Sequence, residues 1–308
     1  MNRLLIFGLG YCGRAVADAA AGYAVTATTR AGAGAAGTAV PFDQAEAAIA
    51  AATHILVTAP PVTAPPVTAP AVTAPPVTAP PGPDGDPVLC RYETAIRASS
   101  GLRWIGYLSS TVVYGNRDGG WVDEDTPPLP TQPRGHRRLA AERVWAGFAS
   151  QCAVDIFRLA GIYGPGRSAF DDLRAGTARR TIKPGHAFGR IHRDDIARAV
   201  IAAMGQGSGL GVRYFNLADD FPSESAAVVT EAARLMGVPP PPEVPFSEAG
   251  LSPMALSFWA ENRKVASRKT QTALGLRWLY PTFREGLTAI WRQERGEGPL
   301  QDRQISRP

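Results

Sequence analysis

Short apolar segments recur along the chain and are separated by alanine-rich stretches in its first part. These segments have the length of buried strands, and the residues between them favour helix. Strands are expected at 4–7, 23–28, 40–42, 54–57, 104–108 and 155–159, and helices at about 86–99 and 137–149. Strands that alternate with helices predict an α/β fold, with a Rossmann-type, doubly wound parallel sheet of about six or seven strands covered on both faces.

The pattern becomes less regular after residue 164. Helices are expected near 193–204, 223–236 and 282–294, with Pro- and Gly-rich joins between elements. The segment 191–204 and a strand at 214–217 still match the first domain. We therefore predict a Rossmann domain of residues 1–164 and 191–217, a smaller, discontinuous C-terminal domain of 165–190 and 218–298, and a tail of 299–308.

A low-complexity segment interrupts the first domain. The sequence Val-Thr-Ala-Pro-Pro is repeated from 57 to 81, with Ala71 as the only substitution. Proline at two of the five positions of the repeat excludes both helix and sheet ladder and favours an extended polyproline conformation. We interpret 57–81 as a solvated insertion rather than a docking segment for a proline-binding groove, because it has no basic anchor residue.

Composition narrows the class of protein. The 308 residues are 45% hydrophobic and 19% charged, which is typical of a globular chain. The net charge is +5, but the basic residues are scattered, so no nucleic-acid partner is expected. Cys12, Cys90 and Cys152 have neither disulfide nor metal-ligand spacing, which indicates a reduced, cytoplasmic protein without a metal. The longest uncharged stretch, 47–83, holds too many prolines for a membrane helix.

A GxGxxG sequence begins at Gly8, directly after the first predicted strand and at the start of a helix. Gly8 would allow a tight turn, Gly10 the approach of a pyrophosphate to the backbone, and Gly13 close helix packing. The helix N-terminus would bind phosphates through its free N–H groups. Tyr11 and Cys12 lie in the same turn, and we interpret Cys12 as packed rather than reactive. The motif predicts a dinucleotide-binding site.

The end of the second strand bears on the choice of dinucleotide. An NAD-binding protein places a carboxylate there for the ribose hydroxyls, whereas this chain has Thr29 and Arg30. A guanidinium beside a hydroxyl suits a 2′-phosphate. We therefore predict NADP as the cofactor, with NAD as the alternative. Asp43, after the third strand, is a candidate acceptor for the adenine amino group.

Three later segments have sequences SSTVVYG (109–115), RLAGIYGPG (158–166) and RIHRDDIA (190–197). They resemble the active-site strand end, the sixth-strand segment and the histidine-aspartate segment of the extended short-chain dehydrogenase/reductase superfamily. The resemblance runs through most of the chain. It implies that the smaller domain binds a small-molecule substrate, and that Ser110 is the catalytic hydroxyl that hydrogen-bonds the substrate oxygen.

The superfamily also has a Tyr and a Lys four residues apart, and this chain departs from that pattern. Counted from Glu142, Arg134 stands at the Tyr position and Arg138 at the Lys position. Arginine keeps its proton near neutral pH and so cannot exchange it with a substrate as the Tyr does. The chain therefore resembles the atypical, epimerase-like members that lack the Tyr-x-x-x-Lys dyad.

Two interpretations of the arginines stay open. At positions i and i+4 of a helix, Arg134 and Arg138 share a face and would clamp a carboxylate or phosphate of the substrate, or they form a solvated basic face. Any chemistry then needs another acid. Tyr114 is the nearest candidate in the sequence, followed by His192 and Tyr163.

The predicted function is that of an NAD(P)-binding oxidoreductase or epimerase-like enzyme of atypical mechanism, with NADP favoured and a small, unidentified carbonyl or hydroxyl substrate. The alternative is a catalytically silent NADP-binding sensor or scaffold, which the missing Tyr and Lys favour. Dehydration is disfavoured, because Thr111 and Val112 replace the Asp-Glu pair that follows the catalytic hydroxyl in the dehydratases of this superfamily.

Overall fold

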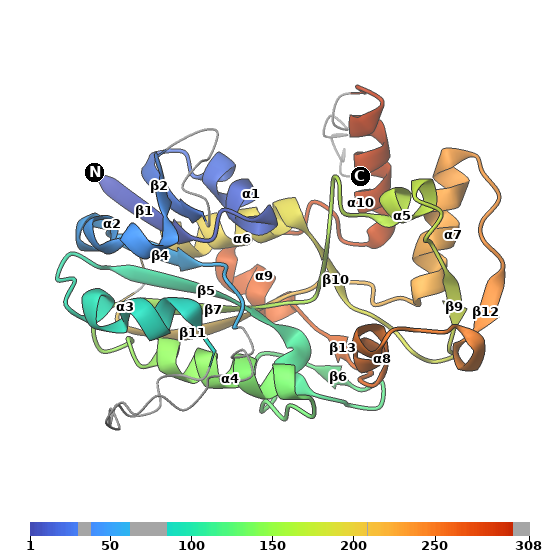
Figure 1. Ribbon diagram of the computed structural model, residues 1–308, viewed down its shortest axis with the longest axis horizontal. Coiled ribbons are helices and arrows are strands. Elements are labelled where there is room, and N and C mark those ends of the chain that lie inside the picture. Colours follow the sequence, from blue (N-terminus) through green and yellow to red (C-terminus); the bar gives the residue numbers. More distant parts are fainter. Residues whose placement is uncertain (30–37, 62–84, 208, 298–308) are drawn as a thin grey trace, which may run out of the picture.

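The fold is built on a single seven-stranded parallel sheet (Figure 1). The computed structural model describes residues 1–29, 38–61, 85–207 and 209–297. The strand order is β11-β7-β5-β4-β1-β2-β3. The strands are β1 (Asn2–Phe7), β2 (Tyr23–Thr29), β3 (Thr38–Pro41), β4 (His54–Val57), β5 (Trp104–Ser110), β7 (Ala153–Leu159) and β11 (Gly211–Leu217). This sheet confirms the predicted α/β, Rossmann-type fold class.

Helices cover both faces of the sheet, because its central strands are apolar on both sides. Every residue of β4 and β7 is buried. One face packs against α1 (Tyr11–Ala19) and α6 (Arg193–Gly205), which also contact each other. The other face packs against α2 (Glu46–Ala51), α3 (Pro87–Arg97) and α4 (Pro133–Ala146). The carboxyl ends of the parallel strands therefore share one edge, where ligands bind in such sheets.

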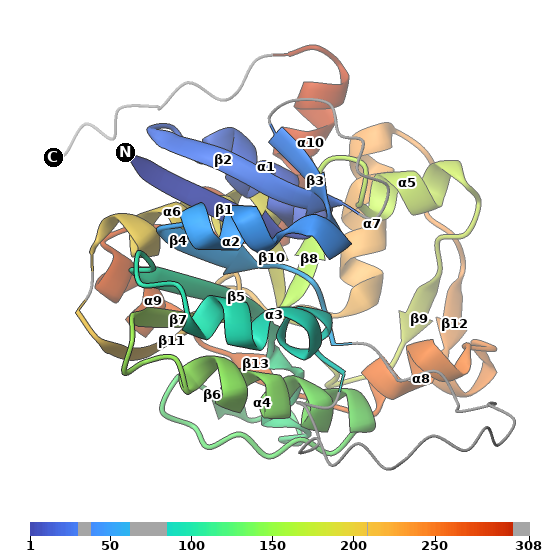
Figure 2. The ribbon, with the colours of Figure 1, turned by 60° about the vertical axis from the view of Figure 1, so that its left-hand side comes forward.

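Most of the remaining elements lie beyond that edge, on the right-hand side of Figure 1, and Figure 2 shows α5, α7, β9, β12 and α8 at the right. They include a small core between α5, α7 and α10. These elements are β8 (Gly161–Tyr163), α5 (Ala169–Arg174), β9 (Arg180–Ile182), β10 (Arg190–His192), α7 (Ser225–Met236), β12 (Glu243–Pro245), the 3-10 helix η3 (Phe246–Glu248), α8 (Pro253–Trp259) and α10 (Phe283–Glu294). The exact limits of the two predicted domains stay a prediction.

Several short elements have no clear signature in the sequence. Strand β8 pairs with β10, β9 pairs with β12, and β6 (Trp121–Val122) pairs with β13 (Lys264–Val265), in each case over only two or three residues. Two 3-10 helices, η1 (Phe42–Gln44) and η2 (Thr111–Tyr114), follow β3 and β5, and α9 (Arg268–Leu274) follows β13. Such short pairings depend on contacts between segments far apart in the chain.

Helix α4 begins at Pro133, four residues before the predicted start. Proline is favoured in the first turn of a helix, because its missing N–H would have no partner there in any case. The difference places Arg134 in the first turn of α4. It also separates the surroundings of Arg134 from those of Arg138, which lies one turn further along.

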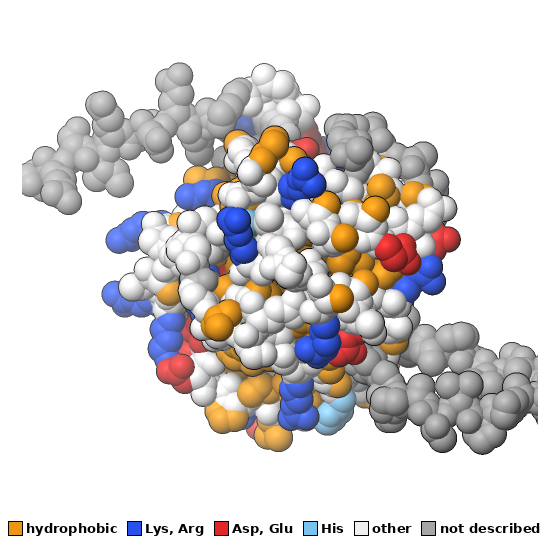
Figure 3. Space-filling view, turned by 90° about the vertical axis from the view of Figure 1, so that its left-hand side faces the viewer, with side chains coloured by type: hydrophobic (Ala, Val, Ile, Leu, Met, Phe, Trp, Pro, Cys, Tyr) orange, Lys and Arg blue, Asp and Glu red, His pale blue; other side chains and the backbone are white. Residues whose placement is uncertain are grey.

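Charged side chains are dispersed over the face shown in Figure 3, where arginines and lysines alternate with acidic and hydrophobic residues. Among the described residues, no helix is long and apolar enough to cross a membrane. No group of three or more histidine, cysteine or acidic side chains in those residues is arranged to hold a metal ion.

His54 is a buried histidine at the start of β4 whose titration should be measurable. It is 7% exposed, packs edge-on against Tyr23, and burial lowers its pKa to about 4. The unfolded chain binds a proton near pH 6.5, so between pH 6.5 and 4 it holds a proton that the folded state excludes. Acidification through this range therefore destabilises the folded state by up to about 1.4 kcal/mol per pH unit for this group.

We expect His54→Phe to reduce the slope of unfolding free energy against pH between 6.5 and 4, because the replacement keeps an apolar ring but does not titrate. Urea denaturation at a series of pH values measures the slope. Between pH 7 and 8 the two proteins should have parallel curves. Equal slopes in the acidic range would show that His54 titrates normally in the folded protein.

Candidate active site

The GxGxxG turn connects β1 to α1 at the ligand-binding edge of the sheet. Gly8 has φ +103°, and its N–H donates to Thr28 Oγ1 over 3.1 Å. A Cβ on Gly13 would lie 2.3 Å from the Gly8 carbonyl oxygen, whereas a Cβ on Gly10 would meet no described atom within 4 Å. Gly8 and Gly13 therefore form the turn itself. Gly10 leaves open the space where the sequence motif places a pyrophosphate.

Tyr11 and Cys12 begin α1 and have different surroundings. The Tyr11 hydroxyl donates to the Pro165 carbonyl over 3.1 Å, so it fastens the turn to the segment that follows β8. Arg193 lies over the Tyr11 ring. Cys12 is 8% exposed, and burial raises its pKa to about 11. The thiol therefore stays protonated at neutral pH, which agrees with a packing role.

The residues proposed to choose between dinucleotides are only partly described. Arg30 lies outside the described residues. Thr29 ends β2, and its Oγ1 is buried without a hydrogen-bond partner among the described residues. Asp43 is exposed in η1, and its backbone carbonyl accepts from Arg91 over 2.7 Å. Its carboxylate keeps the capacity to accept from an adenine amino group.

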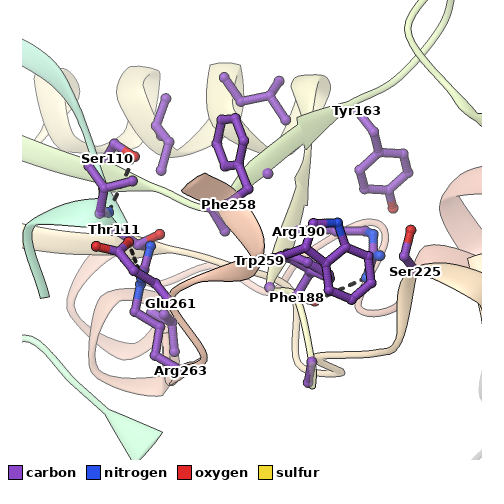
Figure 4. A pocket seen from close by; sticks show the side chains of 18 of the residues that line it. Ser110, Thr111, Tyr163, Phe188, Arg190, Ser225, Phe258, Trp259, Glu261 and Arg263 are labelled. Atoms are coloured by element: carbon purple, nitrogen blue, oxygen red, sulfur yellow. Dashed lines mark hydrogen bonds and ion pairs between the residues drawn. The ribbon is translucent and has the colours of Figure 1, made fainter. Parts of the chain in front are cut away.

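Ser110 ends β5 at the same edge of the sheet as the GxGxxG turn. Its side chain accepts from the Val112 N–H over 3.4 Å at the start of η2. It also lines a cavity of about 440 Å³ between the sheet edge and the smaller lobe (Figure 4). The hydroxyl proton is free to point toward a ligand, because this contact uses only an acceptor site of the oxygen.

Arg134 and Arg138 do not form a clamp, although they are four residues apart on α4. Arg134 lines the cavity, donates to the Ser257 carbonyl over 3.2 Å and stacks 3.8 Å above the Phe258 ring. Arg138 donates instead to the Leu108 carbonyl and the Tyr107 hydroxyl of β5, and it does not line the cavity. The two guanidiniums are therefore not placed to hold one substrate group together, which corrects the predicted clamp. Arg134 alone stays a candidate for binding substrate.

Tyr114, predicted as the nearest candidate acid, does not line the cavity. It is fully buried in η2, where its hydroxyl donates to Asn216 Oδ1 over 2.8 Å and accepts from Arg158 over 3.0 Å. Burial raises its pKa. The phenol is thus used in a core hydrogen-bond network away from the cavity, which excludes it as the acid for a substrate held beside Ser110.

The other two acid candidates also differ in position. His192 is 1% exposed and accepts at Nδ1 from the Asp194 N–H, and burial lowers its pKa to about 4. It is therefore neutral at pH 7, and it does not line the cavity. Tyr163 packs edge-on against His192 and does line the cavity. Burial raises the pKa of Tyr163, so its hydroxyl stays protonated and able to donate.

Several other residues that line the cavity were not indicated by the sequence. Glu261 accepts from Thr131 and from Arg263, and its carboxylate lies 3.9 Å from Arg134. Phe258 and Trp259 come from α8, more than a hundred residues after Ser110. No motif marks these positions, because their role arises only when the smaller lobe folds over the edge of the sheet.

Comparison with known proteins supports this architecture. A "3-diazoavenalumate denitrifying reductase" from a Streptomyces species is 31% identical over 185 residues, 54% of this chain and 58% of that protein. Protein YeeZ of Escherichia coli strain K12 is 33% identical over 136 residues, 44% of this chain and 47% of that protein. The chain thus spans about half the length of the curated relatives it matches. No family model matches the sequence.

Solved structures align over nearly the whole chain. A functionally unknown conserved protein from Silicibacter pomeroyi DSS is 37% identical with a TM-score of 0.81, over 96% of this chain and 99% of that one. Human epimerase family protein SDR39U1 with NADPH has a TM-score of 0.73 at 18% identity, over 94% and 99%. MoeE5 in complex with UDP-glucuronic acid and NAD has a TM-score of 0.71 at 20% identity, over 96% and 99%.

The sheet gives this chain the same fold as these solved structures, which include a human epimerase family protein. This confirms the resemblance seen in the sequence. The chain belongs to the same family as the Silicibacter pomeroyi protein.

Proposed function

We propose that this protein is an NAD(P)-dependent oxidoreductase that reduces a small molecule held in the cavity beside Ser110. The observation that carries the proposal is the arrangement of the GxGxxG turn and Ser110 at one edge of the sheet, with the cavity directly beyond Ser110. The name of the Streptomyces relative, a reductase, supports reduction as the direction. The structures of SDR39U1 with NADPH and MoeE5 with NAD support a nicotinamide dinucleotide as the cofactor.

A bound NAD(P)H would supply a hydride to the substrate. The backbone N–H groups at the start of α1 hold the pyrophosphate, because Gly10 leaves them accessible and no side chain caps this end of the helix. The Ser110 hydroxyl donates to the substrate atom that receives the electron pair. The Arg134 guanidinium stabilises the negative charge that develops there. Arg134 keeps its own proton, so the proton that completes a carbonyl reduction comes from solvent.

We expect Ser110→Ala to lower kcat by about a hundredfold or more, since one donor to a developing oxyanion contributes that much. Affinity for NADPH should change by less than about twofold. The hydroxyl makes one weak contact to the Val112 N–H, so folding should be almost unaffected. Steady-state turnover, with a panel of aldehydes, ketones and aryl acids, measures the first effect, and fluorescence titration the second. Full activity in Ser110→Ala would remove Ser110 from the mechanism.

The preference for NADP over NAD rests on Arg30 and on the absence of an acid beside it. We expect tighter binding of NADPH than NADH, and Arg30→Asp should reverse the order, because a carboxylate repels the 2′-phosphate and accepts from the ribose hydroxyls. Parallel fluorescence titrations of both dinucleotides test this. A preference of the unmodified protein for NADH would contradict it.

A second candidate function is a dinucleotide-binding sensor without chemistry. The replacement of the Tyr and Lys by Arg134 and Arg138 favours it, because Arg138 is used in contacts to β5 and neither residue supplies a proton. A protein that binds NADPH tightly yet oxidises it with none of the panel substrates would support this candidate over the reductase.

A further inference from the structure

Arg190 carries a positive charge that the described protein does not neutralise. It ends on the cavity wall, and its Nη1 donates to the Phe188 and Ser223 carbonyls and to Ser223 Oγ, over 2.7 to 3.1 Å. These acceptors are all neutral. Among the described residues, its side-chain hydrogen bonds all start from Nη1, and it forms no ion pair with a carboxylate within 4 Å. A guanidinium in this position favours an anionic partner.

Asp219 is the acid that interacts with the charge of Arg190, and it is a weak anionic partner. Asp219 is 1% exposed, and burial raises its pKa to about 8. Burial thus favours the protonated form of Asp219, which weakens it as a counter-charge for Arg190. Burial also lowers the pKa of Arg190, although the guanidinium stays charged.

Two hydroxyl groups stand beside the guanidinium. Figure 4 shows Tyr163 and Ser225 on the same side of the cavity as Arg190, away from Ser110 and Thr111. Tyr163 ends β8, where it pairs with His192, two residues after Arg190 on β10, and Ser225 is the first residue of α7. Arg190 and Ser225 are the main donors for a carboxylate. The Tyr163 hydroxyl makes only a long contact of 3.5 Å to the Thr282 carbonyl, which a carboxylate can replace.

The wall between the two ends of the cavity is aromatic. Phe188 and Trp259 pack edge to face with their ring centroids 4.8 Å apart, and His186 lies 5.0 Å from Trp259 behind them. Phe258 adds a third ring, and the Arg134 guanidinium stacks on it with its central carbon 3.8 Å from the ring centroid. Such a wall matches a flat apolar body and has few polar groups for the hydroxyls of a sugar.

We propose that the cavity binds a planar aromatic or conjugated monocarboxylate, with the carboxylate on Arg190, Tyr163 and Ser225 and the apolar body along Phe258 and Trp259. The end remote from the carboxylate then lies at Ser110, where the reduction takes place. This inference rests on the proposed function for the chemistry at Ser110, but the binding it describes is measurable without turnover.

The test compares trans-cinnamate with its methyl ester, which has the same planar body without the charge. We expect calorimetric titration of the full chain, with and without NADP⁺, to show the acid bound at least tenfold more tightly than the ester. Arg190→Gln should bring that ratio close to one, while affinity for NADP⁺ stays within about twofold. Arg180→Gln is a matched control, because Arg180 pairs with Glu243 outside the cavity, and it should leave the ratio unchanged.

Two further variants keep the test independent of the folding of Arg190→Gln. Ser225→Ala removes one proposed donor and should weaken the acid, but not the ester, by about three- to tenfold. Phe258→Ala should weaken both by a similar factor, because its half-exposed ring contacts only the apolar body.

Equal binding of acid and ester by the unmodified protein would overturn the inference. So would binding of UDP-glucose at this site in preference to cinnamate. A loss of NADP⁺ binding alone would count against the proposed function and not against this subsite.

Discussion

Gly10→Val is expected to abolish binding of both NADPH and NADH while the protein stays folded. A Cβ at this position meets no described atom within 4 Å, so the fold has room for the side chain. The same space is the one the motif assigns to the pyrophosphate, and a branched side chain there blocks the approach of phosphate oxygens to the backbone N–H groups. Fluorescence titration should show an affinity at least a hundredfold lower, with an unchanged circular dichroism spectrum.

Two other glycines serve as controls for this result. Gly13→Val should prevent normal folding, because its Cβ would lie 2.3 Å from the Gly8 carbonyl oxygen and the backbone would have to move. Gly205→Ala, at the end of α6, meets no described atom within 4 Å and should change neither stability nor binding. Normal NADPH affinity in Gly10→Val would mean that the dinucleotide binds elsewhere on the chain.

Arg158→Met is expected to cause a large loss of stability. Arg158 and Glu142 form an ion pair of 2.8 Å whose side chains are 4% and 2% exposed. Glu142 also accepts from Ser109, and Arg158 donates to Tyr114. Removal of one partner leaves a buried carboxylate without its counter-charge, which costs about 3–5 kcal/mol. Urea denaturation measures this, and the Tm should fall by about 6–20 °C.

The matched control is an exposed ion pair of the same chemistry. Arg234 is 65% exposed and pairs with Glu231 within one turn of α7, so Arg234→Met should cost far less stability than Arg158→Met. The double variant Arg158→Met/Glu142→Leu should recover much of the loss, because it removes both buried charges together. A double variant no more stable than Arg158→Met would show that the wider network, rather than the unpaired charge, determines the cost.

The sequence determined the sheet and the cofactor turn because both depend on local signals. Buried parallel strands are short apolar segments, and β4 and β7 appear in the sequence within a residue or two of their actual limits. The GxGxxG turn is specified by backbone geometry that only glycine adopts or leaves open, as the positive φ of Gly8 and the close approach at Gly13 show. Ser110 was singled out from the segment 109–115 at the end of β5, and it lines the cavity, while its catalytic role stays a prediction.

Only the tertiary structure decided which side chains face the cavity. Helical spacing places Arg134 and Arg138 on one face of α4, yet packing against β5 directs Arg138 into contacts with backbone, and only Arg134 reaches the cavity. Tyr114 lies close to Ser110 in the chain but turns into the core, because Asn216 and Arg158 offer buried partners for its hydroxyl.

The residues that line the cavity away from Ser110 show most clearly what the sequence alone could not predict. Arg190, Ser225 and Trp259 come from β10, α7 and α8, and nothing in their local sequence marks them as neighbours of Ser110. A local pattern reports how one segment meets water and its own backbone. Whether a charge is neutralised or a ring lines a cavity depends on residues brought together from distant parts of the chain. The sequence therefore determined the glycine turn. The packing of the smaller lobe decided which side chains line the cavity.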